Sequence, residues 1–233
     1  MRDPEPVSGP RLLVAVSAGF LAAGVLVVAT VVALRLATAA WSRGHLADEI
    51  AISLLEVYVG LLIGVVAAFG WRRMHGQLGL RYTGPRHLLL ALGAWMVGTI
   101  AGGALTAALI PLMGEPANNA RDILSVGSDP LFLALIALTV CLLGPLVEEL
   151  LFRGALLAWL ARRMPVAAAV VISALVFAGL HFIPTLLPFL FVLGLTTGFV
   201  RWYTGSTLNS LVVHVCQNTL AVLATLAVLS GAS

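Results

Sequence analysis

The chain has 233 residues, of which 61% are hydrophobic and 10% are charged, and its mean hydropathy is +1.06. Soluble domains carry about a quarter charged residues, so this composition excludes an ordinary soluble protein. It predicts an all-α, polytopic helical membrane protein embedded in a lipid bilayer. The formal net charge of +3 comes from arginine, since the chain contains no lysine. No stretch combines clustered basic residues with interleaved aromatic ones, which argues against a nucleic-acid partner.

The first part of the chain, residues 1–129, predicts an N-terminal tail and three transmembrane helices. A polar, proline-rich stretch of 11 residues is followed by apolar runs at 12–34, 50–71 and 88–112. Four arginines crowd the short segment between the second and third runs: Arg72, Arg73, Arg81 and Arg86. Arginine-rich short loops stay in the cytoplasm, so we expect this loop and the N-terminus to be cytoplasmic.

Residues 130–233 predict four more spans within the same integrated membrane domain. Residues 130–163 contain no polar loop, and only Gly144-Pro145 interrupts the apolar pattern. A helix of this length exceeds the hydrocarbon core of about 30 Å. We predict a helix kinked at Pro145, the alternative being a break into two half-segments. Three further apolar runs bring the total to about seven transmembrane helices: 166–182, 186–203 and 208–229.

Two adjacent carboxylates, Glu148 and Glu149, lie inside the long apolar run, and Arg153 follows one turn later. Ionisable groups at membrane depth are costly and usually functional. On a helix, Glu149 and Arg153 share a face, which suits an ion pair. Glu148 is rotated by about 100° and must face a different partner. The alternative interpretation is that all three side chains form a buried charge network that fixes helix register.

Two later spans carry histidines at a repeated spacing. Phe177 and His181 are four residues apart, and so are His214 and Asn218, which places each pair on one helix face. A single histidine in an apolar helix is more often a core residue than a reactive one. Two histidines and a diglutamate, however, all need partners in a solvent that offers none. We therefore expect these groups to meet in one intramembrane site.

Such a set of side chains suits the hydrolysis of an amide by an activated water. A buried carboxylate can act as a general base and a histidine can orient the water, while a second histidine and an amide can donate to the developing oxyanion. We expect no cofactor, but one glutamate and two histidines also suit zinc, with Glu148, His181 and His214 as the alternative ligands. The usual HExxH spacing is absent. Ser173 remains open as a nucleophile.

The three motifs resemble those of the CPBP family in the same order. This family comprises the CAAX prenyl endopeptidases and the bacterial proteins called Abi or bacteriocin-processing membrane proteases. The matching motifs are Glu148-Glu149-xxx-Arg153, Phe177-xxx-His181 and His214-xxx-Asn218. The resemblance covers about residues 130–225. It implies that Arg153 holds Glu149 and that Phe177 supports the site.

The resemblance also implies catalytic roles for the remaining motif residues. Glu148 matches the glutamate that activates the water, and His181 matches the histidine that assists it. His214 and Asn218 match the pair that stabilises the oxyanion. Glu149 belongs to the same catalytic set, beside Glu148. No departure from the family pattern occurs within the motifs.

We therefore expect an intramembrane endopeptidase that hydrolyses a peptide bond of a membrane-associated protein or peptide with a glutamate-activated water. Eukaryotic members of the family cut the last three residues from prenylated proteins. A chain with arginine but no lysine indicates a GC-rich bacterial genome, where such substrates are not expected, and hence the bacterial inner membrane. Two alternatives stay open: a zinc-dependent membrane metalloprotease with the same residues, and a non-catalytic transporter or scaffold.

Overall fold

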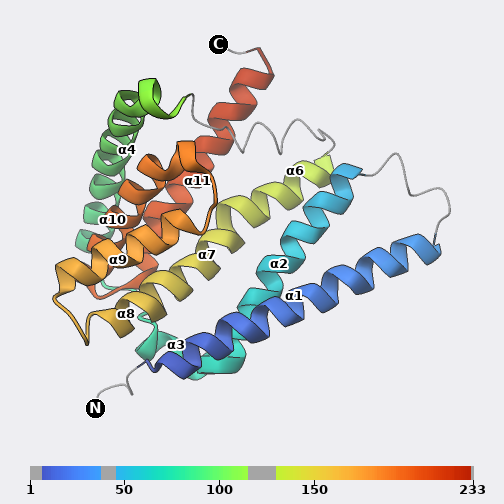
Figure 1. Cartoon of the computed structure of the whole chain (residues 1–233), viewed down its shortest axis with the longest axis horizontal. Coiled ribbons are helices and arrows are strands. Elements are labelled where there is room, and N and C mark those ends of the chain that lie inside the picture. Colours follow the sequence, from blue (N-terminus) through green and yellow to red (C-terminus); the bar gives the residue numbers. More distant parts are fainter. Residues whose placement is uncertain (1–6, 38–45, 115–129, 232–233) are drawn as a thin grey trace. The chain divides into compact units, whose positions relative to one another are not determined.

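The computed structural model describes residues 7–37, 46–114 and 130–231, and these residues contain helices and no strand (Figure 1). The helices before residue 115 are α1 (Gly9–Ala37), α2 (Leu46–Phe69), α3 (Trp71–Gln77) and α4 (Pro85–Met113). Those after residue 129 are α6 (Pro130–Ile136), η1 (Ala137–Leu143), α7 (Gly144–Glu149), η2 (Leu150–Leu156), α8 (Leu157–Leu160), α9 (Val166–Gly179), η3 (Pro184–Leu186), α10 (Leu187–Thr204) and α11 (Thr207–Leu229).

Six helical segments in the described part of the chain are long and apolar enough to cross a membrane. They are Gly9–Thr30, Glu49–Phe69, Pro85–Met113, Pro130–Leu160, Pro184–Thr204 and Thr207–Val228, and the shorter apolar helix Val166–Gly179 precedes the fifth. Each of the seven predicted spans therefore has a helix, and the prediction of a polytopic helical membrane protein is confirmed.

The predicted loop between the second and third spans contains a helix, α3, that the sequence did not predict. Gly70 adopts a φ of 74°, in the left-handed region that favours glycine, and separates α2 from α3. No further glycine or proline interrupts the chain before Gly76, so a short helix can form directly after the turn.

The long segment Pro130–Leu160 stays helical through Gly144-Pro145, so the alternative of two half-segments does not occur. Two of its turns, η1 and η2, are π-helical. At the end of η1 the N–H of Gly144 donates to the carbonyl of Thr139, five residues earlier. A proline inside an α-helix collides with the carbonyl four residues before it, whereas a π turn holds one extra residue there. The π turn before Pro145 thus lets the helix continue.

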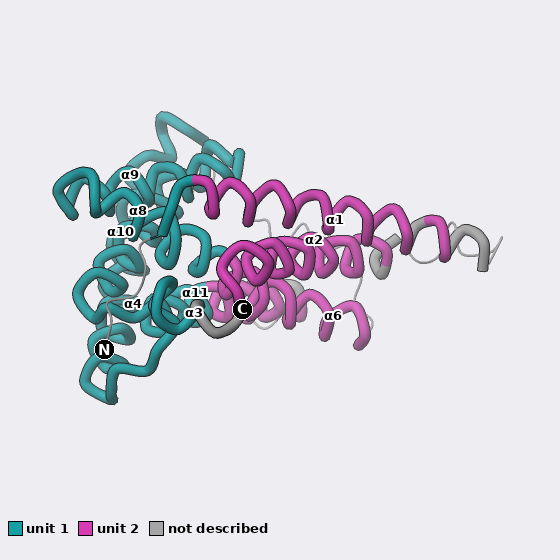
Figure 2. Tube along the Cα trace, turned by 90° about the horizontal axis from the view of Figure 1, so that it is seen from below, with its two compact units in different colours: residues 1–9, 71–118, 148–217 teal, residues 10–70, 119–147, 218–233 magenta. Residues whose placement is uncertain are grey.

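The chain folds into two compact units, each assembled from three stretches of sequence (Figure 2). Unit 1 comprises residues 1–9, 71–118 and 148–217. Within it, α10 packs against both α9 and α4. Gly194 of α10 permits a close approach, because a Cβ atom there would lie 2.9 Å from the Cα of Ala174. The buried cluster of this unit consists of Ala91, Phe177, Leu193, Val200 and Val213.

Unit 2 comprises residues 10–70, 119–147 and 218–233. Here α1 and α2 pack closely over glycines: a Cβ atom at Gly60 would lie 2.5 Å from the Cα of Ala23. Small residues at such contacts are typical of helix pairs in membranes. The buried cluster of unit 2 joins α2, α6 and α11 through Ala51, Phe132, Ile136 and Val222.

Candidate active site

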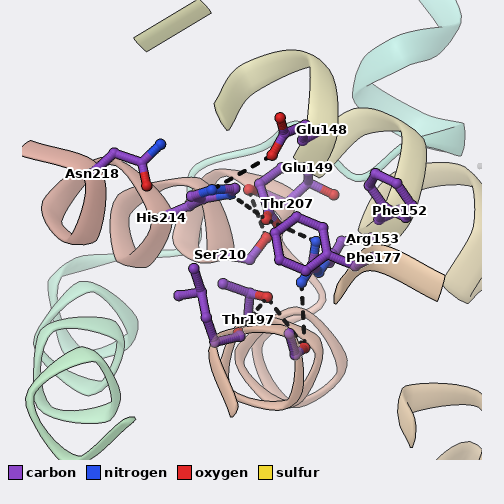
Figure 3. Close-up of polar contacts among 12 residues, drawn as sticks. Glu148, Glu149, Phe152, Arg153, Phe177, Thr197, Thr207, Ser210, His214 and Asn218 are labelled. Carbon is purple, nitrogen blue, oxygen red and sulfur yellow. Dashed lines mark hydrogen bonds and ion pairs between the residues drawn. The ribbon is translucent and has the colours of Figure 1, made fainter. Parts of the chain in front are cut away.

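Glu149 and Arg153 form a fully buried ion pair on successive turns of the long helix (Figure 3). Arg153 Nη1 lies 3.2 Å from Glu149 Oε1, and the side chains of both residues are 0% exposed. The contact expected from their spacing is therefore present. Removing either partner would leave an uncompensated charge in an apolar interior, which is strongly unfavourable.

Arg153 also connects the long helix to α9 and α10. Its Nη2 donates to the carbonyl of Gly194 on α10 at 3.4 Å. Its guanidinium carbon lies 4.4 Å from the centroid of the Phe177 ring on α9. A cation over an aromatic face is attracted by the ring quadrupole. These contacts fix the guanidinium in place, and through it the carboxylate of Glu149.

The ring of His214 on α11 approaches both glutamates, one with each of its nitrogens (Figure 3). Its Nδ1 is 3.0 Å from Glu149 Oε1, and its Nε2 is 3.6 Å from Glu148 Oε2. A carboxylate only accepts hydrogen bonds, so the first contact assigns a proton to Nδ1. The second distance is too long for a direct hydrogen bond.

The two neighbouring glutamates differ in their exposure. The side chain of Glu149 is 0% exposed, whereas that of Glu148 is 16% exposed. Both carboxylates lie close to His214. Glu149 therefore has a second partner in addition to Arg153, which was the partner expected from the sequence. The helix thus places a fully buried carboxylate, Glu149, and a partly exposed one, Glu148, next to the same imidazole.

Phe177 lies in the middle of the site and contacts both histidines edge-on. Its ring centroid is 4.8 Å from that of His181 and 5.6 Å from that of His214, and Phe152 packs against it at 5.3 Å. His181 follows the end of α9, and its Nδ1 lies 2.8 Å from the carbonyl of Phe177. Because a carbonyl can only accept, Nδ1 carries a proton in this contact, and Nε2 is the ring nitrogen that is not engaged by it.

Asn218 lies one turn after His214 on α11, at the spacing noted in the sequence. Its side-chain nitrogen donates to the carbonyl of Val140 in η1 at 2.8 Å, and both residues belong to unit 2. The other motif residues, from Glu148 to His214, belong to unit 1. The structure therefore brings Glu148, Glu149, Arg153, Phe177 and His214 together, with His181 against Phe177.

Two alternatives left open by the sequence can be compared with this geometry. The hydroxyl of Ser173 donates to the backbone carbonyl of Phe152 at 3.2 Å, which is a contact between helices and not the contact of a nucleophile with a base. Within the described residues, no group of three or more His, Cys, Asp or Glu side chains converges in a way that could hold a metal ion. Of the alternative zinc ligands, His181 turns its Nδ1 to a backbone carbonyl.

A further polar group, which the sequence did not predict, lies close to His214. Trp95 Nε1 and Thr99 Oγ1 of α4 both donate to Gln217 Oε1 of α11, at 3.3 and 2.7 Å. Gln217 is 8% exposed and follows His214 by three residues. A glutamine within an apolar span was the available signal, since polar groups there need partners. Its partners could not be named before the packing of α4 against α11 was known.

Comparison with known proteins identifies one part of the chain. Residues 130–220 match the family model described as Type II CAAX prenyl endopeptidase Rce1-like. No curated protein and no solved structure matches the chain. The matched residues include the diglutamate, Arg153, both histidines and Asn218. In agreement with the motifs and with the helical fold, residues 130–220 are therefore similar to the type II CAAX prenyl endopeptidase family.

Proposed function

We propose that the protein is an intramembrane endopeptidase that cleaves a membrane-associated protein or peptide with a water activated by Glu148. The main support is the unequal exposure of the two glutamates, 16% for Glu148 and 0% for Glu149. A general base must reach the water from which it takes a proton. Glu149 is enclosed by Arg153 and His214, so its position suits an anchor for the imidazole.

In the first step of this mechanism, Glu148 takes a proton from the water as the water oxygen bonds to the scissile carbonyl carbon. His181, with its Nε2 available as an acceptor, assists in orienting the water. The electron pair of the carbonyl moves onto its oxygen. His214 donates from Nε2 to this oxyanion, which is the role that the family resemblance gives to the pair His214 and Asn218. Donors placed where charge develops are the largest contribution to many hydrolases.

In the second step the oxyanion reforms a carbonyl and the C–N bond breaks. Glu148 returns its proton to the leaving amine nitrogen, so that one peptide bond and one water give one carboxyl group and one amine. The glutamate ends the cycle in the state in which it began. No group of the protein forms a covalent bond to the substrate in this scheme.

The proposed setting is the inner membrane of a bacterium, with the N-terminus in the cytoplasm. The multi-pass helical architecture supports a membrane location. The arginine-rich segment between α2 and α4 supports the orientation, because such segments stay in the cytoplasm.

The proteolytic function can be tested without knowing the substrate. Cells that make the wild-type protein are compared with cells that contain the same amount of the Glu148→Gln variant in their membranes. New peptide termini in the membrane fraction are identified by mass spectrometry. We expect termini that depend on the wild type, and we expect the purified protein in detergent to cleave a synthetic peptide spanning one of these sites. Identical termini in both strains would contradict the proposal and favour a transporter or scaffold.

We also propose that the reaction needs no metal. The purified protein should cleave the same synthetic peptide at an unchanged rate in the presence of a chelator, and metal analysis should find no stoichiometric zinc. Loss of activity on chelation, restored by one equivalent of zinc, would establish the zinc-dependent alternative with Glu148, His181 and His214 as ligands.

A further inference from the structure

The amide of Gln217 is held by two hydrogen bonds to the same atom. Trp95 Nε1 lies 3.3 Å and Thr99 Oγ1 lies 2.7 Å from Gln217 Oε1. All three residues belong to unit 1. A glutamine side chain has several rotatable bonds and loses considerable entropy when it is fixed. Two donors on one oxygen therefore give this side chain a defined position.

The indole of Trp95 determines which end of the amide faces α4. The oxygen and nitrogen of a glutamine amide have nearly the same shape, so their assignment must come from their partners. An indole N–H can only donate, and the atom facing it must therefore be the acceptor, Oε1. The Nε2 amine group then lies on the other side of the amide, away from Trp95.

The Nε2 group is the part of Gln217 that remains available. Among the hydrogen bonds of the described residues, those of Gln217 both end on Oε1. The residue as a whole is 8% exposed. In the described part of the chain, Nε2 is not one of the fully buried side-chain atoms without a hydrogen-bond partner. The amide nitrogen, with its two N–H groups, is thus held in place on a side chain that keeps only a small exposed area.

Two contacts place this donor beside the proposed reaction centre. Gln217 is three residues after His214 on α11, and side chains at that spacing are neighbours on a helix surface. Trp95 packs against the cluster that contains Phe177 and Val213. Phe177 in turn contacts the ring of His214 at 5.6 Å.

We infer that Gln217 is a substrate-binding residue whose Nε2 donates to a backbone carbonyl of an extended peptide close to the scissile bond. Trp95 and Thr99 act as positioning residues that aim this donor. The inference rests on the proposed proteolytic function, because it assigns a subsite of the same active site. A peptide backbone supplies carbonyl acceptors at regular intervals whatever its side chains, so one fixed donor can set the register of the substrate.

The competing explanation is that the three residues only fasten α4 to α11. Polar side chains do join helices in membranes in this way. The two explanations differ in the substrate atom that they involve. If the residues only join two helices, their substitution lowers stability and changes kcat/KM equally for all peptides. If Gln217 donates to the substrate, the effect of its substitution depends on whether one particular substrate carbonyl is present.

The test uses the synthetic peptide from the membrane comparison and analogues in which each carbonyl near the cleaved bond is replaced in turn by CH₂. With the wild type, one analogue should lose about tenfold in kcat/KM, the size expected for one hydrogen bond. Gln217→Met should lose about tenfold on the parent peptide and nothing further on that analogue, because the coupling between the two changes measures their contact.

Asn209→Ala is the matched control. Asn209 is another buried amide of α11, and its Nδ2 donates to Thr83 Oγ1 at 2.7 Å. Its loss should lower the melting temperature and leave the analogue pattern of the wild type intact. Thr99→Val retains the Gln217 amide but removes one of its two supports, so the penalty for the same analogue should shrink while the variant remains folded.

Three results would overturn the inference. The first is a wild-type analogue pattern in folded Gln217→Met. The second, decisive if Gln217→Met does not fold, is an unchanged pattern in Thr99→Val. The third is the absence of any terminus that depends on the wild type, which removes the proposed function as well. In the first two cases, cleavage by the wild type shows that the protease assignment survives alone.

Discussion

At the scale of single residues, the site depends on a difference between two side chains of identical chemistry. Glu149 is enclosed by Arg153, by His214 and by its own helix, whereas Glu148 is partly exposed beside the opposite nitrogen of the same imidazole. Nδ1 of His214 is therefore held by Glu149, whereas Nε2 is turned towards the partly exposed carboxylate of Glu148. In the proposed mechanism, Glu149 therefore orients the imidazole, whereas Glu148 takes up the proton.

Glu148→Gln should give a folded protein that has lost nearly all turnover. The amide keeps the size of the carboxylate but cannot take a proton from water. Turnover of the synthetic peptide and thermal unfolding should be measured in one detergent, with the wild type as the reference. A variant that cleaves at a near-normal rate would refute the role assigned to Glu148.

Glu149→Gln and Arg153→Ala should each lower stability as well as activity. Each change leaves the opposite charge of a fully buried pair without its partner, a loss of about 3–5 kcal/mol in such pairs. The double variant Glu149→Gln with Arg153→Met removes both charges, and we expect its melting temperature to exceed that of either single variant. If Glu149→Gln is inactive but as stable as the wild type, the two glutamates have the reverse of the proposed roles.

At the scale of the elements, the packing of α10 on α9 holds the site together. Gly194 serves both the helix contact and the arginine: it lies against Ala174, and its carbonyl accepts a hydrogen bond from Arg153. Any side chain at this position must push the two helices apart. The carbonyl that receives Arg153 would move with α10, so a packing change here should reach the reaction centre.

Gly194→Ala should therefore be destabilising by about 1–3 kcal/mol, the usual effect of overpacking. Gly93→Ala on α4 is the control, because a Cβ atom there meets nothing within 4 Å. Alanine is the better helix former by up to about 1 kcal/mol, so this second variant should be neutral or slightly stabilised. Thermal unfolding of both proteins provides the comparison, and equal destabilisation would contradict the packing argument.

The sequence was sufficient for the properties that a local stretch determines. Apolar runs marked the spans, and the spacing of four residues placed Glu149 with Arg153 and Phe177 with His181. It was not sufficient for contacts between distant segments. The pairing of Gln217 with Trp95 and Thr99 depends on which helices are neighbours, and no pattern in the sequence states this. The π turns were missed because their residues are as apolar as those of an α-helix.

At the scale of the whole molecule, the family match and the site lie in the later part of the chain, whereas residues before 130 carry no recognised motif. They nevertheless contribute to unit 1, since α4 supplies Trp95 and Thr99 to the contact with Gln217. The third span therefore does more than hold the chain in the membrane. The family match begins at residue 130, and no recognised motif lies before it. As a domain boundary, residue 129 stays a prediction.

The orientation in the membrane can be measured with reporter fusions. A reporter at Gly79, between α3 and α4, should give a cytoplasmic signal, because arginines surround this position. A reporter after Ser233, which lies outside the described residues, should give a signal from the opposite side, because the predicted number of spans, seven, is odd. A periplasmic signal at Gly79 would reverse the predicted topology.

The two π turns of the long helix have a consequence for how relatives should be aligned. Each turn holds one residue more than an α turn, and a residue added or lost in a helix rotates everything beyond it by about 100°. Arg153 lies within η2, and Leu157 and Leu160 pack with Ala169 directly after it. The length of the segment between the diglutamate and α8 is thus as constrained as its residue types. A one-residue gap there would change the face that the helix presents, even where every motif letter is retained.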